Sequence, residues 1–468
     1  MPGNHGCNAV ACHDVAARYA AKLLAQLGET ARPCRMPPRH PAQGWAESGL
    51  MHLTGIAGGP PDLCPTPLPD CADGVIAALD ALATLNPLFT STTSSAPARA
   101  HALGSISGAG LLTERAALYG HTRQGATSPG GSCHLLEARD GVLALNLARD
   151  EDRDLLPAWL EIGATDWSSI AAAIASRPLD DLIGRGRLLG LALAPVTMPG
   201  AQASWFTVCA EGPMLSGIAT APLVVDLASL WAGPLCSRLL QILGARVLKV
   251  ESVQRPDGAR RGHPAFYDLL NAGKESIALD FRSAEGRNQL CALIAAADIV
   301  IEGSRPRALR QLGIDAETWV RTRGGRTWIS ITGYGRTPPE AEWVAFGDDA
   351  AVAAGLSGLY HQSSGHLAFC GDAIGDPLTG MHAALLAWSS HCRGRSRLYS
   401  IALRDVVAHC LDQDRPPDAA TARARREAWL AHLVGQPVAV PVARRPAGAA
   451  AALGEHTRSV LMEFGIPC

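Results

Sequence analysis

Short apolar runs alternate with helical patterns in the second half of the chain. The runs are typical of buried strands, and the segments between them repeat apolar residues at helical spacing. The expected strands are PLVVDLA from 222, ARVLKVE from 245, SIALDF from 276, DIVIE from 298 and TWISITGYG from 327. This alternation predicts an α/β fold with a doubly wound, Rossmann-like, largely parallel sheet, which binds ligands at the carboxyl ends of its strands.

The first half of the chain has fewer strand patterns. Apolar residues recur at helical spacing over Val15–Gly28 and again from Asp73 to about Leu85, and Ser/Thr residues at 91–95 indicate a linker. The next segment combines a helix signal, a glycine turn and two strand patterns, at 114–119, 128–132, 133–136 and 142–148. We therefore expect a smaller α/β domain over 98–200 and a boundary at 201–220.

Two N-terminal blocks recur later in the chain. Leu23-Leu24 recurs 216 residues later at Leu239-Leu240, whereas Asp70 and its following glycine recur 306 residues later at Asp376 and Gly380. The unequal offsets mean that the first copy lacks about 90 residues between its two blocks, which in the second copy hold most of the sheet. We interpret residues 1–90 as a truncated copy of the later domain, and Asp70 as a vestige of Asp376.

Composition limits the class of protein. The chain has 468 residues, 47% of them hydrophobic and 18% charged, which is typical of a soluble globular protein with several domains. A net charge of −2 without a long basic run gives no basis for binding nucleic acid or an anionic membrane. The sequence has neither GxGxxG after the first strand of the sheet nor GxxxxGK[ST], so dinucleotide and P-loop functions are disfavoured.

The cysteines and the N-terminal sequence bear on the compartment. Thirteen cysteines are scattered without a CxxC pair, so neither a disulfide framework nor a metal site is favoured, and Cys7 with Cys12 is the one weak candidate pair. The first residues lack the pattern of a signal peptide, and no apolar run approaches the length that spans a bilayer. We expect a cytoplasmic protein.

The run FCGDAIGDPLTGMH, residues 369–382, contains the strongest candidate for chemistry. Gly375 and Pro377 restrict the backbone, and apolar residues then recur at helical spacing, so Asp376 is expected at or just before a helix N-terminus. A carboxylate there faces unpaired N–H groups and the positive end of the helix dipole. Asp is also a preferred helix cap, so the stretch alone leaves a structural and a chemical role open.

The motifs taken together resemble family III CoA-transferases (CaiB/BaiF type). This group includes formyl-CoA, carnitine and bile-acid CoA-transferases and has the α-methylacyl-CoA racemases as close relatives. The resemblance rests on DLASLWAGPLCSRLLQILGARVLKVE from 226, LLNAGKESIALDF from 269, ADIVIEGSRPRALRQLGI from 297, WISITGYG from 328, GDAIGDPLTGMHAALLAW from 371 and LGEHTRSVLMEFG from 453. It is specific as an ordered set, and it implies the family III fold.

The resemblance implies an acyl-CoA:carboxylate CoA-transferase. Asp376 would attack the thioester carbonyl to form a mixed anhydride and then an aspartyl-CoA thioester, with coenzyme A as a cosubstrate and with neither a metal nor a tightly bound cofactor. A glycine-rich loop closes over this aspartate in the family, and the similar positions here are Gly130 and Gly131. The positions that would bind CoA are Trp231, Lys274, Arg305, Arg310 and Tyr334.

Two other functions stay open. A racemase needs a histidine in a GHD-like motif upstream of the aspartate, and the corresponding stretch here reads Phe346-Gly347-Asp348-Asp349. His382 follows Asp376 on the same helix, where we expect a buried structural histidine. The third function is that of a homologue that binds CoA without catalysis.

The expected domain order departs from that of the family. Residues 1–90 form the truncated copy, 98–200 the small domain, 221–410 the CoA-binding large domain, and 411–468 a tail that returns to the large domain. The resemblance implies a homodimer, possibly interlocked, acting on an acyl-CoA and a carboxylic acid. Within the sequence it stays open whether one chain builds the site or two chains share it.

Overall fold

The computed structural model describes residues 14–31, 33, 38–84, 103–161, 163, 166–200, 204–216 and 220–467. Cys7, Cys12 and the expected linker at 91–95 lie outside these residues. Among the helices described, none combines the length and hydropathy needed to cross a bilayer.

The described part of the chain contains one large sheet of seven strands in the order β4-β10-β9-β8-β5-β6-β7. Six strands run parallel, and the edge strand β4 pairs antiparallel with β10. Their bounds are β4 Thr207–Glu211, β5 Leu223–Asp226, β6 Arg246–Ser252, β7 Glu275–Leu279, β8 Ile299–Glu302, β9 Thr327–Thr332 and β10 Arg397–Ala402. All five expected strands are confirmed, whereas β4, inside the expected boundary, and β10 were not predicted.

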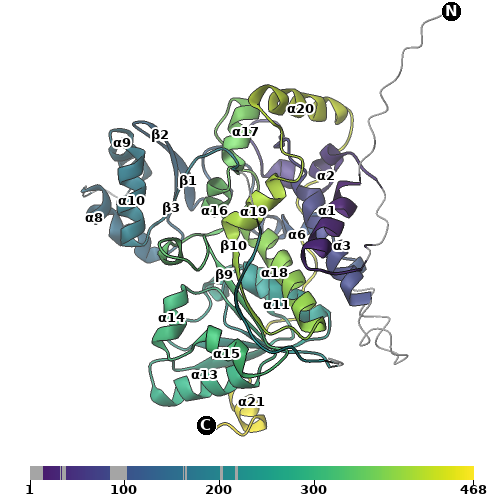
Figure 1. Cartoon of the computed structure of the whole chain (residues 1–468). Coiled ribbons are helices and arrows are strands. Elements are labelled where there is room, and N and C mark those ends of the chain that lie inside the picture. The colour runs from purple at the N-terminus through teal and green to yellow at the C-terminus, as the bar shows by residue number, and fades with distance from the viewer. Residues whose placement is uncertain are drawn as a thin grey trace, which may run out of the picture.

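Helices cover both faces of this sheet, as the predicted doubly wound fold requires (Figure 1). Val224 and Ile299 belong to one apolar core and their neighbours Val225 and Val300 to the other, because successive side chains in a strand point to opposite faces. The helices of this half are α11 Ala232–Ile242, α12 Pro264–Asn271, α13 Ala284–Ala296, α14 Pro306–Gln311, α15 Ala316–Thr322, α16 Gly347–Ala353, α17 Leu356–Ser364, α18 Gly375–Cys392, α19 Leu403–Leu411, α20 Ala419–His432 and α21 Thr457–Glu463. The last helix, α21, contacts β7 at the far edge of the sheet.

A small antiparallel sheet lies beside the large one (Figure 1). Its strands are β1 Cys133–Ala138, β2 Gly141–Asn146 and β3 Ala192–Pro195, and its helices are α8 Leu156–Leu160, α9 Trp167–Ala175 and α10 Leu179–Leu189. It has its own apolar core, which includes Leu143, Trp159 and Leu193. Helix α16 packs on β2 and β3, so the small sheet contacts the helix that precedes the Asp376 stretch.

The N-terminal part is helical. Its elements are α1 Val15–Gln26, α2 Pro41–Glu47, α3 Leu68–Thr84, α6 Gly108–Leu111 and α7 Glu114–Tyr119. The first predicted helix is confirmed, but the second begins five residues before Asp73, because Pro69 is tolerated in the first turn of a helix. The earlier start places Asp70 in the first turn of α3, as Asp376 is in the first turn of α18.

The helix pairs α1–α3 and α11–α18 make matching contacts. A β-carbon placed on Gly74 of α3 would lie 2.6 Å from the carbonyl oxygen of Ala16, and one on Gly380 of α18 would lie 2.6 Å from that of Ala232. These residues are related by the two offsets of the sequence repeat. Helices α3 and α18 also pack against each other, so the two pairs form one continuous helical layer.

Candidate active site

Asp376 is the second residue of α18, which confirms its predicted place at a helix N-terminus. Its side chain is half-buried, and its backbone N–H donates to the Ala373 carbonyl at 2.9 Å. The backbone N–H of Gly347 points to the Asp376 carboxylate. A β-carbon on Gly347 would lie 2.5 Å from Asp376 Oδ2, so the close approach of this backbone to the carboxylate depends on glycine.

Three more carboxylates surround Asp376. Asp348 and Asp349 lie in the first turn of α16, and Asp372 lies in the turn that leads into α18. The Ala373 N–H donates to Asp348 Oδ1 at 2.8 Å, which ties this turn to α16. Asp349 Oδ1 accepts from Asn146 Nδ2 at 2.9 Å, whereas its buried Oδ2 has no hydrogen-bond partner among the described residues.

Burial shifts the protonation of these acids. Desolvation raises the pKa of Asp376 to about 7, and it does the same for Asp348 and Asp349. For Asp376 the nearby charge of Arg115 opposes the rise, and the charges of Asp349 and Asp372 add to it. A carboxyl group of this kind exchanges its proton near neutral pH, which is typical of catalytic acids and bases.

Arg115 is the cation of this cluster. It projects from α7, and its Nη1 donates to Asp372 Oδ1 at 2.9 Å, while His121 Nδ1 lies 3.3 Å from Asp372 Oδ2. Burial lowers the pKa of the Arg115 guanidinium, but the charges of Asp372, Asp348 and Asp376 outweigh burial and raise it. The N-terminal half of the chain thus supplies the positive charge beside Asp376.

The predicted glycine loop lies against this ion pair. The Gly131 N–H donates to the Ser128 carbonyl at 2.8 Å, and Gly131 has φ +80°, which favours glycine. A β-carbon on Gly130 would lie 3.1 Å from Arg115 Nη2 and 3.4 Å from Asp372 Oδ1. The backbone at Gly130 therefore lies against the Arg115–Asp372 ion pair. Stabilisation of an oxyanion by this loop stays a prediction.

Trp231 lies on the other side of Arg115. Its ring centroid is 6.0 Å from the Arg115 guanidinium carbon, and its side chain is buried at the start of α11. The contacts of Arg115 thus connect Gly130 and Trp231 to the Asp376 cluster.

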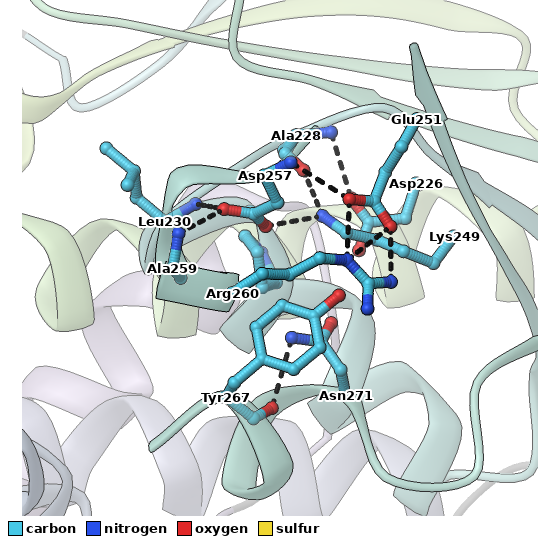
Figure 2. Close-up of polar contacts among 12 residues, drawn as sticks. Asp226, Ala228, Leu230, Lys249, Glu251, Asp257, Ala259, Arg260, Tyr267 and Asn271 are labelled. Carbon is cyan, nitrogen blue, oxygen red and sulfur yellow. Dashed lines mark hydrogen bonds and ion pairs between the residues drawn. The ribbon is translucent and has the colours of Figure 1, made fainter. Parts of the chain in front are cut away.

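A buried charge network shapes the turn that carries Trp231 (Figure 2). Lys249 binds the Ala228 carbonyl and lies 2.9 Å from Asp257 Oδ2. Asp257 Oδ1 in turn accepts from the Leu230 N–H at 2.9 Å, which stabilises the positive φ of 69° at Leu230. Because a left-handed backbone is unfavourable for leucine, this network determines how the turn presents Trp231.

Lys274 belongs to a second buried network. Its ammonium donates to Ser237 Oγ at 2.7 Å, the Pro234 carbonyl at 2.9 Å and Asn271 Oδ1 at 3.0 Å, and it pairs with Asp226 at 3.2 Å. Burial lowers the pKa of Lys274 to about 8. The three N–H donors of Lys274 are therefore engaged inside the protein, which disfavours a contact with CoA. That contact stays a prediction.

The other predicted CoA contacts are spread over the large domain. Tyr334 is buried, and its hydroxyl donates to the Leu193 carbonyl at 3.3 Å. Arg310 is exposed and donates to Glu317 Oε1 at 2.9 Å. Arg305 is exposed directly before α14. None of these contacts joins the Arg115 cluster in the described structure.

Arg305 has basic neighbours that the sequence did not single out. Burial lowers the pKa of its guanidinium, the charges of Arg307, Arg149 and Arg255 lower it further, and the charge of Glu342 opposes them. Arg255 follows β6 and Arg305 follows β8, so both lie past the carboxyl ends of parallel strands, and Arg149 comes from the small domain. We call Arg149, Arg255, Arg305 and Arg307 the arginine cluster.

Asp70, the counterpart of Asp376, forms an ion pair. Arg39 Nε donates to Asp70 Oδ1 at 2.9 Å, and Arg39 Nη2 donates to Asp73 at 2.7 Å. A β-carbon on Gly44 would lie 3.0 Å from Asp70 Oδ2, much as Gly347 approaches Asp376. Burial raises the pKa of Asp70 to about 6.

His382 is buried, and both ring nitrogens are engaged. Its Nδ1 lies 2.7 Å from the Leu378 carbonyl and its Nε2 lies 2.8 Å from the Tyr19 hydroxyl. The expectation of a buried histidine is confirmed. Sequence reasoning missed Arg115, His121 and Asp372, and it did not assign Asp348 and Asp349 as acids of the site. The available signal for the aspartates was acidic residues at the start of two apolar helices.

The sequence has recognisable relatives. Residues 215–415 match the model of CoA-transferase family III. The chain is 30% identical over 216 residues to a succinate–glutarate CoA-transferase of Agrobacterium fabrum, covering 42% of this chain and 53% of the relative. It is 29% identical over 195 residues to a formyl-CoA:oxalate CoA-transferase of Rhodopseudomonas palustris, covering 39% of this chain and 46% of the relative.

One solved structure with detectable similarity is a CAIB/BAIF family protein from Brucella suis, with 26% identity, a TM-score of 0.37 and coverage of 51% of this chain and 60% of that one. The chain spans about half the length of the curated relatives that it matches. Residues 215–415 contain six of the seven strands of the large sheet, together with Trp231 and Asp376. Residues 215–415 of this chain are therefore similar to CoA-transferase family III.

Proposed function

We propose that the protein transfers coenzyme A between carboxylic acids, with Asp376 as the nucleophile. The observation that carries this proposal is the half-buried Asp376 carboxylate, whose pKa burial raises to about 7 and whose charge Arg115 stabilises. A carboxylate that is desolvated and still ionised is a stronger nucleophile than one in water. The match of residues 215–415 to CoA-transferase family III supports the same reaction.

The proposed reaction proceeds through two covalent intermediates on Asp376. Asp376 attacks the thioester carbonyl, the C–S bond breaks, and CoA leaves as a thiolate from a mixed anhydride. The thiolate then attacks the Asp376 carbonyl, which releases the donor acid as a carboxylate and leaves an aspartyl-CoA thioester. The acceptor carboxylate runs these steps in reverse, so no proton or electron is consumed.

The arginine cluster is the proposed binding site for the phosphates of CoA. Arg255 follows β6 and Arg305 follows β8, the two strands on either side of β5, at the edge of the parallel sheet where such folds bind ligands. The charges of Arg307, Arg149 and Arg255 add to the burial that lowers the pKa of Arg305, and a bound polyanion would offset them. Arg307 also pairs with Glu342, and Arg255 with Glu151. Arg310 is engaged with Glu317, so Arg305 is the stronger of the two positions that the resemblance implied.

Mass spectrometry of the intact protein tests the nucleophile. The protein is incubated with a panel of acyl-CoAs that includes succinyl-CoA and formyl-CoA, which the relatives' names mention, and is then treated with hydroxylamine. We expect a CoA adduct before treatment and a hydroxamate at Asp376 after it, both absent in Asp376→Asn. The matched control is Asp70→Asn, which changes the counterpart aspartate and should retain both signals.

A wild-type protein that binds CoA and forms no adduct with the panel contradicts the proposal. An adduct that maps to Asp70, or that survives in Asp376→Asn, contradicts the assignment of the nucleophile. Either result would favour the non-catalytic CoA-binding function or a different chemical group.

One observation favours racemisation as a second candidate. The sequence has no histidine in the GHD-like stretch upstream of Asp376, but the structure brings His121 within 3.3 Å of Asp372. A His/Asp pair can exchange the α-proton of a branched acyl-CoA. Exchange of that proton in deuterium oxide, lost in His121→Ala, would establish this reaction, and its absence would leave CoA transfer as the function.

A further inference from the structure

The placement of Arg115 adds a substrate contact to the proposed transferase. Its Nη1 binds Asp372, and among the described residues this is the hydrogen bond found for its guanidinium. A guanidinium has five N–H donors. The Arg115 side chain is 26% exposed, whereas Asp372 is fully buried, so Arg115 is held at one end by a buried carboxylate while part of its side chain is accessible.

Aromatic rings hold the guanidinium in place. Its central carbon lies 5.7 Å from the centroid of Tyr119 and 6.0 Å from that of Trp231, both within range of a cation–π interaction. Asp372 is itself held by His121 at 3.3 Å. Arg115 is therefore positioned before any substrate binds.

Charge conservation explains why a carboxylate can bind beside four aspartates. When Asp376 is acylated it loses its negative charge, and the same charge appears on the released acid or on the thiolate. The total charge next to Arg115 then stays constant through the reaction. A second carboxylate in contact with Arg115 thus replaces the charge of Asp376 rather than adding to it.

We propose that Arg115 binds the free carboxylate of the acid that enters or leaves the Asp376 site. This proposal rests on the CoA-transferase function proposed above. The acceptor is then an acid whose carboxylate reaches Arg115 while the rest of the acid extends past Trp231.

The test compares two ways of discharging the aspartyl-CoA thioester. The thioester is formed with one acyl-CoA, freed of unbound ligand, and then treated with increasing concentrations of the matching acid or with hydroxylamine, which carries no charge. In Arg115→Gln we expect discharge by the acid to need about 10- to 100-fold more acid, because a charge-assisted contact is lost. Discharge by hydroxylamine should stay within about twofold of the wild-type rate.

Two further variants make the result interpretable. Arg115→Lys retains the charge without the forked geometry and should fall between wild type and Arg115→Gln. Arg39→Gln removes the arginine that pairs with the counterpart Asp70 and should leave acid discharge unchanged. If Arg115→Gln does not fold, the lysine variant alone carries the comparison.

The outcomes separate the two proposals. If the wild-type protein forms no thioester, the transferase function fails. If the thioester forms and Arg115→Gln and Arg115→Lys discharge it at wild-type acid concentrations, the Arg115 proposal is overturned and the transferase function stands. Equal losses with acid and with hydroxylamine would also overturn it, because they indicate a general disturbance of the site.

Discussion

Asp349 shows how a buried residue that does not touch a substrate sets the working range of the site. It is fully buried, its Oδ1 accepts hydrogen bonds from Asn146 Nδ2 and the Phe346 N–H, and its Oδ2 has no partner among the described residues. Its charge is among the causes that raise the pKa of Asp376. The acid therefore holds Asp376 closer to neutrality than burial alone would.

The substitution Asp349→Asn should move the pH dependence of transfer. Asn retains an oxygen for the two hydrogen bonds and removes the neighbouring charge, so the pKa of Asp376 falls from about 7. Because the ionised form reacts, kcat should rise with pH in both proteins, and the half-maximal pH should lie about one unit lower in the variant. The measurement is kcat against pH at saturating acyl-CoA.

A matched variant at the counterpart site checks this shift. Asp73→Asn changes a buried acid close to Asp70, and Arg39 binds this acid as well as Asp70. The substitution should leave the pH profile of transfer unchanged. A profile that does not move in Asp349→Asn would show that another group controls the ionisation seen in kcat.

At the scale of elements, the two helix pairs α1–α3 and α11–α18 are held by the same contact. In each pair a glycine lets one helix lie against a carbonyl oxygen of the other, at Gly74 and Gly380. The layer that positions Asp376 is therefore built from two similar halves that pack through α3 and α18.

Alanine at either glycine should destabilise the fold by a similar amount. The added carbon would lie 2.6 Å from a backbone oxygen in both cases, so the helices must move apart. We expect Gly74→Ala and Gly380→Ala each to lower the free energy of unfolding by about 1–3 kcal/mol. Urea unfolding followed by circular dichroism measures both values.

The control is Gly184→Ala in α10, where the added carbon meets nothing within 4 Å. This variant should be neutral or more stable by about 0.5–1 kcal/mol, because alanine favours helix. A large loss at Gly380 with none at Gly74 would contradict the matched packing.

For the whole molecule, the structure places Asp376, Arg115 and the Gly130 loop in one chain. Arg115 and Gly130 come from the part of the chain before the large sheet, and Asp376 lies in α18, between strands β9 and β10 of that sheet. The homodimer implied by the resemblance stays a prediction. Assembly of these three groups does not require a second copy.

Activity should therefore be independent of protein concentration. We expect the rate per chain to stay constant when the protein is diluted from micromolar to low nanomolar concentration, with one CoA adduct per chain in the intact mass. Light scattering at the upper concentrations gives the oligomeric state independently. A rate per chain that falls as a dimer dissociates would show that two chains share the site.

The sequence predicts those features that are encoded in a continuous stretch of residues. The five strands follow from their apolar runs, and the place of Asp376 follows from the glycine and proline on either side of it in the first turn of its helix. The role of Arg115 could not be predicted in this way, because its partner Asp372 is 257 residues away and only the tertiary fold brings them together. Lys274 was predicted to bind CoA, but the sequence does not reveal that burial surrounds its ammonium with internal acceptors.

The two helix pairs also affect how this protein can vary. In an assembly of identical chains, any substitution appears at both symmetric positions at once. Here Asp70 and Asp376, or Gly74 and Gly380, are encoded separately. Stabilising substitutions on the Asp70 side therefore leave the residues of the Asp376 side unchanged, including those with a proposed role in the reaction. The Asp70 side is for this reason the natural place to begin engineering.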